Sequence, residues 1–152
     1  MSAAPRLQAA ALVLAAWLGA ALITVAVVAP GAFAVLPSRT IAGTMVGRVL
    51  PSLFVAGIVV GVAVALAGVP RRAAVAALVA AGSCAVSQFW ITPKLDRLRA
   101  EIAGPVDVLP PGDARRVAFG ALHGYNVAGL GTAMIGTAVC LWFLLAAMRP
   151  RN

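Results

Sequence analysis

One histidine is the side chain of this sequence best suited to metal or proton chemistry, because a neutral imidazole binds transition metals and titrates near neutrality. His123 stands inside an apolar stretch, with Asn126 three residues later. Ionisable groups are costly in hydrocarbon, so His123 is a candidate functional residue. It is interpreted either as a haem or copper ligand or proton relay, or as a histidine bonded to a backbone carbonyl or to Ser87 or Gln88 of a neighbouring helix. We favour the second interpretation.

A metal site at His123 would need further ligands. The other soft donors in question are Cys84, Cys140, Met45 and Met134. Met134 stands eleven residues from His123, about 16 Å along a helix at roughly 1.5 Å per residue, and Cys140 is further still. We therefore expect no cofactor in a single chain, and treat haem or copper held by His123 of two subunits as the alternative.

Further polar side chains lie at helical spacing. Arg39 and Arg48 flank a glycine-rich segment, where they would contact phosphate headgroups or recognise an anion. Gln88 belongs to a stripe at i, i+4 spacing suited to interhelical hydrogen bonds, made with Ser83, Cys84 and Ser87. No P-loop, GxSxG or HExxH motif occurs, so we lean against an enzyme.

The composition decides which solvent surrounds the elements that carry these residues. Of the 152 residues 62% are hydrophobic and only 11% are charged, with a mean hydropathy of +1.02. A water-soluble fold of this length could not bury so much apolar surface, whereas about 20 apolar residues in a helix cross a bilayer. The net charge of +8 comes from arginines at the edges of apolar runs, which suits lipid headgroups and not nucleic acid.

The apolar runs predict four transmembrane helices in a single domain over residues 1–152. We expect the spans at residues 7–29, 50–69, 73–92 and 117–147. Pro30-Gly31 should end the first span, which we interpret as retained and not as a signal peptide, and Pro93 should stop the third. A short amphipathic helix over 38–49, capped by Ser38, should lie in the interface between the first two spans.

Residues 93–116 form a polar loop that contains all four acidic residues. Within it, residues 94–103 can form a short helix, and Gly104-Pro105 and Pro110-Pro111-Gly112 should break it. Asp113 is a suitable N-cap for a last helix that extends from Ala114 to Met148. Five Lys and Arg residues lie on the side of the termini and seven on the other, so the positive-inside rule leaves the orientation open.

Small residues recur at four-residue spacing, which allows helix backbones to approach closely in lipid. The pairs are Gly43 and Gly47, Gly57 and Gly61, and Gly120 and Gly124. We expect most of them to make contacts within the chain, with a homo-oligomer interface as the alternative. Cys84 and Cys140 lie inside apolar runs, so a disulfide is not expected.

Several stretches carry a family resemblance. They are Ala29-Pro30-Gly31-Ala32-Phe33-Ala34-Val35-Leu36, Ala42-Gly43, Arg48-Val49-Leu50-Pro51, Pro93 with Leu95 and Arg97–Arg99, and Phe119-Gly120-Ala121-Leu122-His123-Gly124. Through them the chain, from about Leu7 to Leu145, resembles the transmembrane protein 205-like family, or domain of unknown function 4149, which is distantly similar to copper-resistance protein D membrane proteins. The resemblance implies a four-helix membrane domain without an established activity.

The sequence thus predicts an all-α, multi-pass membrane protein that contacts the lipid bilayer. Its Ala-, Val-, Gly- and Arg-rich composition indicates a bacterial inner membrane. A non-enzymatic binding or structural module in membrane or metal-stress physiology is the favoured function. The alternatives are a small oligomeric transporter or channel and a haem- or copper-binding redox protein that uses His123.

Overall fold

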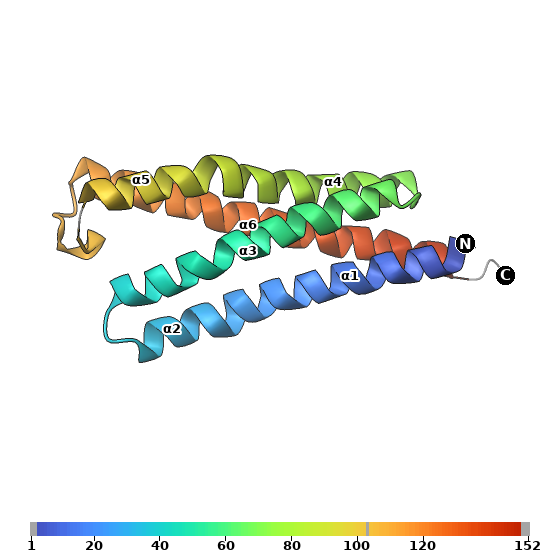
Figure 1. Ribbon diagram of the computed structural model, residues 1–152, viewed down its shortest axis with the longest axis horizontal. Coiled ribbons are helices and arrows are strands. Elements are labelled where there is room, and N and C mark those ends of the chain that lie inside the picture. Colours follow the sequence, from blue (N-terminus) through green and yellow to red (C-terminus); the bar gives the residue numbers. More distant parts are fainter. Residues whose placement is uncertain (1–2, 103, 150–152) are drawn as a thin grey trace.

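Four long helical spans make up the protein. The computed structural model describes residues 3–102 and 104–149. Its helical spans Ala4–Val35, Arg39–Leu66, Arg71–Ile102 and Ala114–Met148 are each long and apolar enough to cross a membrane. They run side by side, with both ends of the chain at the same end of the bundle (Figure 1). The predicted four-helix transmembrane bundle is confirmed, and the described residues contain no strand.

The first span continues through the proline that was expected to end it. Helix α1 (Ala3–Ile23) passes into the π-helical turn η1 (Thr24–Val28) and then into α2 (Ala29–Val35). The prediction that Pro30-Gly31 ends this span is therefore wrong. A proline ring clashes with the carbonyl four residues earlier, which for Pro30 lies inside η1, and the wider π turn moves that carbonyl away.

The third span passes its proline in the same way. Helix α4 (Arg71–Val86) is followed by the π turn η2 (Ser87–Ile91) and by α5 (Thr92–Ile102). Pro93 therefore does not stop the span, and the short helix expected from residue 94 is the continuation of the third span. Each π turn ends two residues before a proline. In lipid a broken helix would leave backbone groups unpaired, so the wide turn keeps the helix continuous.

The second span is longer at one end than predicted and shorter at the other. Helix α3 (Arg39–Leu66) begins after Ser38, whose side chain accepts a hydrogen bond from the Ile41 N–H as expected of an N-cap. Residues 39–49 form its first turns, so the separate interfacial helix over 38–49 is not present. The helix ends at Leu66 and not at residue 69, because Gly68 takes a φ of +71° in the turn that leads into α4.

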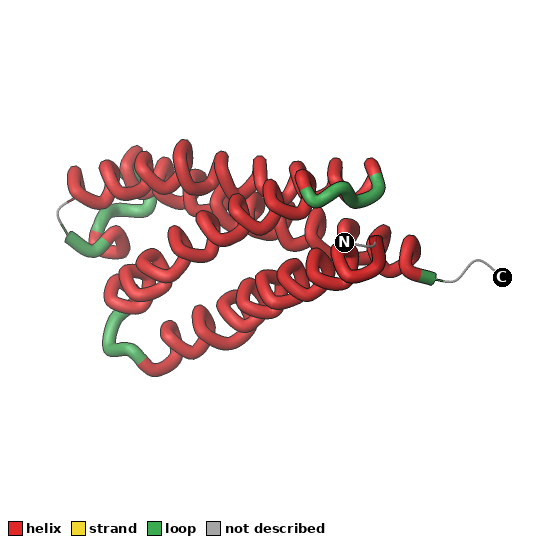
Figure 2. Tube along the Cα trace, turned by 45° about the vertical axis from the view of Figure 1, so that its right-hand side comes forward, coloured by secondary structure: helices red, strands yellow, loops and turns green. Residues whose placement is uncertain are grey.

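The polar segment between α5 and the last helix is compact. It holds the 3₁₀ turn η3 (Val106–Val108), and Gly104-Pro105 and Pro110-Pro111-Gly112 lie outside the α-helices as predicted. Helix α6 (Ala114–Met148) has the expected bounds, and the Asp113 side chain caps it. Short loops join the spans (Figure 2).

Small residues let the four spans pack closely. Helix α4 packs against both α3 and α6, and α1 packs against α3 and α6. A Cβ atom at Gly57 would lie 2.6 Å from Cys84 Sγ, and one at Gly61 would lie 2.7 Å from the Ala77 carbonyl oxygen. The expectation that this glycine pair makes contacts within the chain is confirmed. Beside Gly57, the Trp17 indole N–H donates to the Leu53 carbonyl oxygen over 2.9 Å.

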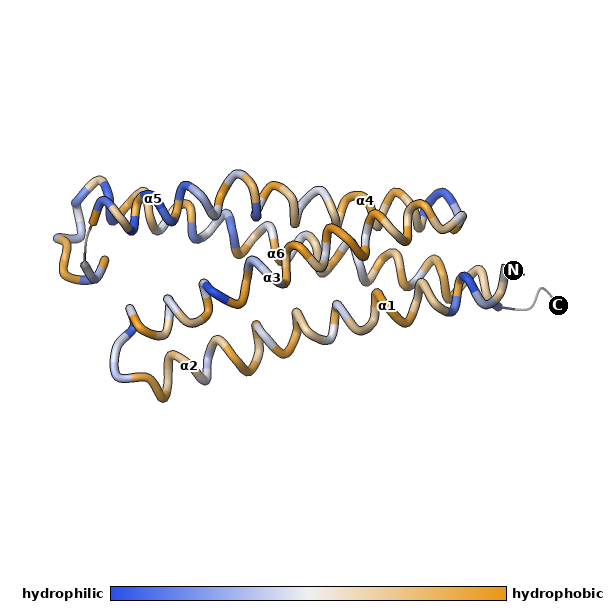
Figure 3. Tube along the Cα trace, viewed as in Figure 1, coloured by the Kyte–Doolittle hydropathy of each residue, from blue (hydrophilic) through white to orange (hydrophobic). Residues whose placement is uncertain are grey.

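The apolar core lies in the middle of the bundle and toward the chain ends. One buried cluster contains Leu14, Val64, Cys140 and Leu144, and a second contains Trp17, Phe54, Cys84 and Leu130. Many large apolar side chains point outward along the spans, whereas hydrophilic residues concentrate near the ends of the bundle and along α5 (Figure 3). Such a surface is suited to lipid, so the chain is a multi-pass membrane protein.

Candidate functional site

A cleft of about 650 Å³ lies at the end of the bundle opposite the chain ends. Here the hairpin of α2 and α3 diverges from α5 and the start of α6 (Figure 1). The residues that line the cleft come from α2, α3, α5, the loop after α5, and α6. Its charged and polar lining includes Arg39, Asp96, Arg99, Asp107, Arg116, His123 and Asn126; its apolar lining includes Phe33, Val46, Leu50, Leu95 and Phe119.

The π turn η2 sets which side of α5 faces this cleft. The Thr92 hydroxyl donates to the Ser87 carbonyl oxygen over 2.9 Å, and the same oxygen accepts the Thr92 N–H. Beyond the turn, Leu95 is buried with 4% exposure. Asp96 and Arg99 follow on the cleft side. The helical continuation past Pro93 therefore carries charged residues into the site.

Arg99 connects three helices across the cleft. Its Nη1 atom lies 3.3 Å from Asp96 Oδ1, and its guanidinium carbon lies 5.5 Å from the centre of the Phe119 ring. The same Nη1 is 3.2 Å from where a Cβ atom of Gly47 would stand, so the guanidinium rests on the bare backbone of α3. Gly47 thus makes room for a cation and not for a neighbouring helix.

Two further arginines line the cleft. Arg116 donates through Nη1 to the Leu109 carbonyl oxygen over 2.6 Å, which fixes the loop before α6. Arg39, at the start of α3, is exposed, and its side chain forms no hydrogen bond or ion pair with the residues that the structure describes. Two aspartates, Asp96 and Asp107, oppose the three arginines, so the cleft carries one excess positive charge with His123 neutral.

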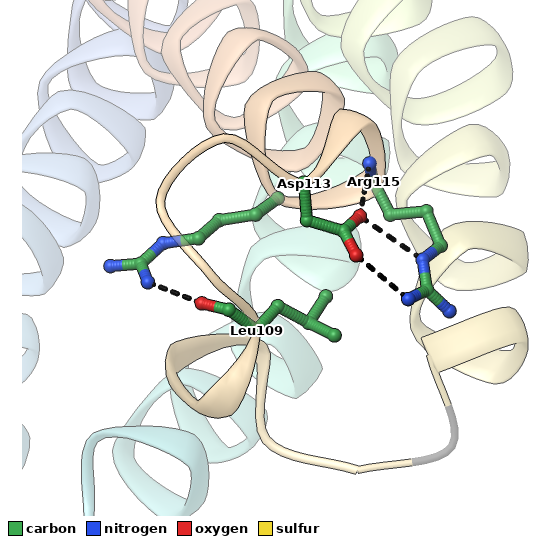
Figure 4. A network of polar contacts seen from close by, with 4 residues as sticks. Leu109, Asp113 and Arg115 are labelled. Carbon is green, nitrogen blue, oxygen red and sulfur yellow. Dashed lines mark hydrogen bonds and ion pairs between the residues drawn. The ribbon is translucent and has the colours of Figure 1, made fainter.

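Asp113 and Arg115 form a separate polar cluster at the start of α6 (Figure 4). Arg115 Nη2 lies 2.8 Å from Asp113 Oδ2, and both the backbone N–H and the Nε of Arg115 donate to Oδ1. These hydrogen bonds from Arg115 lower the pKa of the Asp113 carboxyl to about 2. Neither residue lines the cleft, so this pair caps a helix and leaves the charge of the cleft unchanged.

Asn126 is the deepest polar residue of the cleft. Among the lining residues of α6 it lies furthest along the helix, and it is only 7% exposed. Its amide oxygen Oδ1 is buried and accepts no hydrogen bond. Two adjacent residues of η2 are in the same condition, since Ser87 Oγ and Gln88 Oε1 are also buried without a partner. Such groups in hydrocarbon require a donor or an acceptor from elsewhere.

His123 is exposed and lines the cleft one turn before Asn126. Its ring lies parallel to that of Phe119, with centroids 6.4 Å apart. No side-chain hydrogen bond joins His123 to Ser87, to Gln88 or to any other residue in the described ranges, so the favoured bundle contact is not formed. Among those residues no group of three His, Cys, Asp or Glu side chains could hold a metal. Haem or copper between two chains stays a prediction.

The cleft gathers some of the residues selected from the sequence and not others. Arg39, His123 and Asn126 line it, whereas Arg48 and Gln88 do not. Arg48 is exposed elsewhere on α3. Sequence reasoning missed Arg99 and Arg116 because it placed both in the polar loop 93–116, with only a short helix over 94–103 inside it. The i, i+3 spacing of Asp96 and Arg99 was the available signal, because it places an ion pair on one face of that helix.

The remaining small-residue pairs behave differently from Gly57 and Gly61. A Cβ atom at Gly120 or Gly124 would meet nothing within 4 Å, so this pair makes no close helix contact in the single chain. Gly129 and Gly136, which the spacing did not single out, pack against Ser87 and Ala80 of the third span. A homo-oligomer through the free pair stays a prediction. Cys84 and Cys140 are buried and free, as expected.

Comparison with known proteins identifies one family. The model of a domain of unknown function (DUF4149) matches residues 12–103, which is more than half of the 152-residue chain. The match includes α3, α4 and α5 and ends before the Phe119–His123 element, and similarity to transmembrane protein 205 and to copper-resistance protein D stays a prediction. No curated protein and no solved structure matched the chain. The chain belongs to the DUF4149 family, whose function is unknown.

Proposed function

We propose that this protein is a non-enzymatic membrane module that binds a ligand in the cleft between its two helical hairpins. The observation that carries the proposal is the buried, unpaired amide oxygen of Asn126 at the deep end of a cleft lined by three arginines. A buried polar atom without a partner costs about 1–3 kcal/mol. A ligand that donates a hydrogen bond would recover this free energy only in the bound state.

The lining residues favour binding over catalysis. Nucleophilic catalysis requires a nucleophile held by a base, and a base oriented by a third group. His123 lies parallel to the Phe119 ring and has no carboxylate partner within the described part of the chain. Arg99 and Arg116 supply donors for an anion, and Asn126 supplies an acceptor. The composition supports a site in the inner membrane of a bacterium.

Native mass spectrometry of the protein, purified from membranes in a mild detergent, tests the proposal. We expect the wild type to retain a bound molecule other than detergent, and Asn126→Leu to lose about 80–90% of it, since one hydrogen bond changes affinity roughly tenfold. Arg48→Gln is the control, because Arg48 is a polar residue of α3 that does not line the cleft. A bound molecule on neither protein, or equal amounts on wild type and Asn126→Leu, would contradict the proposal.

A further inference from the structure

The chemistry of the cleft changes with depth. Arg39 and Arg116 lie near the starts of α3 and α6, where the spans begin. Gly47, against which the Arg99 guanidinium packs, follows Arg39 by eight residues, or about 12 Å along the helix at roughly 1.5 Å per residue. Asn126 follows Arg116 by ten residues, or about 15 Å. A ligand would thus meet cations first and an amide acceptor deepest.

The guanidinium of Arg99 is available to an anion. Its ion pair with Asp96 is long, at 3.3 Å, and the two side chains are 37% and 62% exposed. Pairs of this kind contribute little to stability, so a better anion can replace the carboxylate. The planar fork of guanidinium donors matches two oxygens of a phosphate group. Contact with the Phe119 ring and the bare backbone of Gly47 keeps the fork in the cleft.

Apolar side chains complete the walls between these polar points. Phe33, Leu50 and Leu95 line the cleft together with Val46 and Phe119, and Phe33 is 49% exposed. The same helices present apolar faces to lipid, so acyl chains surround the hairpins that bound the cleft. A molecule that brings its own acyl chains to this place is already concentrated there by the bilayer.

We infer that the ligand is an anionic glycerophospholipid whose headgroup carries a hydroxyl group, with its phosphate on Arg99 and that hydroxyl donating to the Asn126 amide oxygen. This inference rests on the proposed function and names its ligand class. The arginines favour a ligand with a negatively charged phosphate, and the unpaired Asn126 oxygen favours a ligand with a hydrogen-bond donor. The apolar walls favour a lipid over a water-soluble phosphate ester. Phosphatidylglycerol has each of these features.

Native mass spectrometry in nanodiscs of defined composition tests the inference with three lipids. Phosphatidylglycerol has the charge and the hydroxyl groups, phosphatidylmethanol has the same charge and no hydroxyl, and phosphatidylcholine is zwitterionic and has no donor. For the wild type we expect phosphatidylglycerol to bind about tenfold more tightly than phosphatidylmethanol, and phosphatidylmethanol more tightly than phosphatidylcholine. Soluble glycerol 1-phosphate should bind far more weakly than either anionic lipid.

Variants assign each preference to a residue. Asn126→Leu should make phosphatidylglycerol and phosphatidylmethanol bind equally. Arg99→Gln should weaken the binding of both anionic lipids by about tenfold or more. Arg99→Lys should weaken their binding less, since lysine keeps the charge and loses the planar pair of guanidinium donors. Arg48→Gln removes the same charge outside the cleft and should change neither preference. Melting curves of each variant establish that it is folded.

Equal binding of phosphatidylglycerol and phosphatidylcholine would overturn the inference. So would an equal loss of lipid binding in Arg48→Gln and Arg99→Gln, because lipid would then bind only through general surface charge. Tight binding of glycerol 1-phosphate would also overturn it in favour of a soluble phosphate ester. If the molecule purified with the wild type is not a lipid but is lost in Asn126→Leu, the inference fails and the proposed function stands. If nothing is bound and no lipid is preferred, both fail.

Discussion

At Asn126 a buried polar atom without a hydrogen-bond partner costs folding free energy. Its amide lies in a part of α6 where water is scarce, and folding leaves the oxygen without a donor. Leucine has the same number and branching of side-chain heavy atoms and no polar atoms. A residue that served only packing would be expected to be apolar, so the free energy that Asn126 costs the empty protein is consistent with a role in binding.

We therefore predict that Asn126→Leu stabilises the empty protein. After exchange into detergent that removes bound molecules, the melting temperature of the variant should exceed that of the wild type by about 2–4 °C, as expected for roughly 1 kcal/mol in a chain of this length. A thermal shift assay measures the difference. A lower melting temperature for the variant would mean that Asn126 is a structural residue with a partner inside the bundle.

Asp113 gives a prediction about pH. Its pKa falls to about 2 in the folded protein because Arg115 donates to its carboxylate, whereas an unfolded aspartate has a pKa of about 3.9. A lowered folded pKa means that the contribution to stability is complete above about pH 4 and is lost as the pH falls toward about 2. Melting curves of wild type and Asp113→Ala should differ above pH 4 and converge below it. A difference at pH 2 as large as that at pH 7 would contradict this account.

At the scale of the elements, the first and third spans each contain a proline and continue past it through a π turn. Thr24–Val28 and Ser87–Ile91 are both π turns that end two residues before a proline. In each span a threonine hydroxyl donates to a backbone carbonyl at the turn or just before it, from Thr24 to Ala20 and from Thr92 to Ser87. Prolines inside transmembrane helices are tolerated where the freed backbone groups find new partners.

The two π turns also explain why the sequence predicted the number of spans correctly and the ends of two spans incorrectly. Apolar run length predicted the number of spans. Cap chemistry predicted that a helix begins after Ser38, although as a separate interfacial helix, and that the last helix begins after Asp113. The prediction that each proline ends a helix applies to helices in water, because water can pair with the backbone groups at the ends of a broken helix. That rule separated Arg99 from the third span and assigned it to a short helix within the polar loop 93–116, outside the candidate site. The cleft itself depends on how two hairpins diverge, which no local pattern records.

Helix packing gives a prediction with a matched control. Gly61→Ala would place a Cβ atom 2.7 Å from the Ala77 carbonyl oxygen, so the α3 and α4 backbones must move apart. We expect a loss of about 1–3 kcal/mol, the usual cost of overpacking. Gly82→Ala, in α4, meets nothing within 4 Å and should be neutral or stabilising by up to about 1 kcal/mol. Equal effects of the two changes in a thermal or denaturant melt would contradict the close contact.

For the whole molecule, four spans place both ends of the chain on one side of the membrane and the α5–α6 connection on the other. The cleft opens near that connection, so its access to ligand depends on orientation. Lys and Arg residues are almost equally divided between the two sides, five near the termini and the Arg71-Arg72 turn and seven elsewhere. Charge therefore does not decide which compartment the cleft faces.

Labelling of single cysteines should establish the topology. In intact cells a membrane-impermeant maleimide should label Ser38→Cys and Asp107→Cys together, or Arg72→Cys alone, because these positions lie at opposite ends of the bundle. The native thiols Cys84 and Cys140 are buried and should stay unlabelled in the control. Labelling of all three introduced cysteines from one side would contradict the four-span arrangement.

The wide turn at Ser87–Ile91 also makes the length of this span a determinant of which side chains line the cleft. A π turn contains one residue more than an α turn, and each residue of a helix rotates the side chains that follow by about 100°. A relative that lacked one residue here would keep an unbroken span, yet Arg99 would swing more than a quarter of a revolution away from Gly47. Insertions and deletions in this family, usually harmless when they fall in loops, would at this position exchange one lining of the cleft for another.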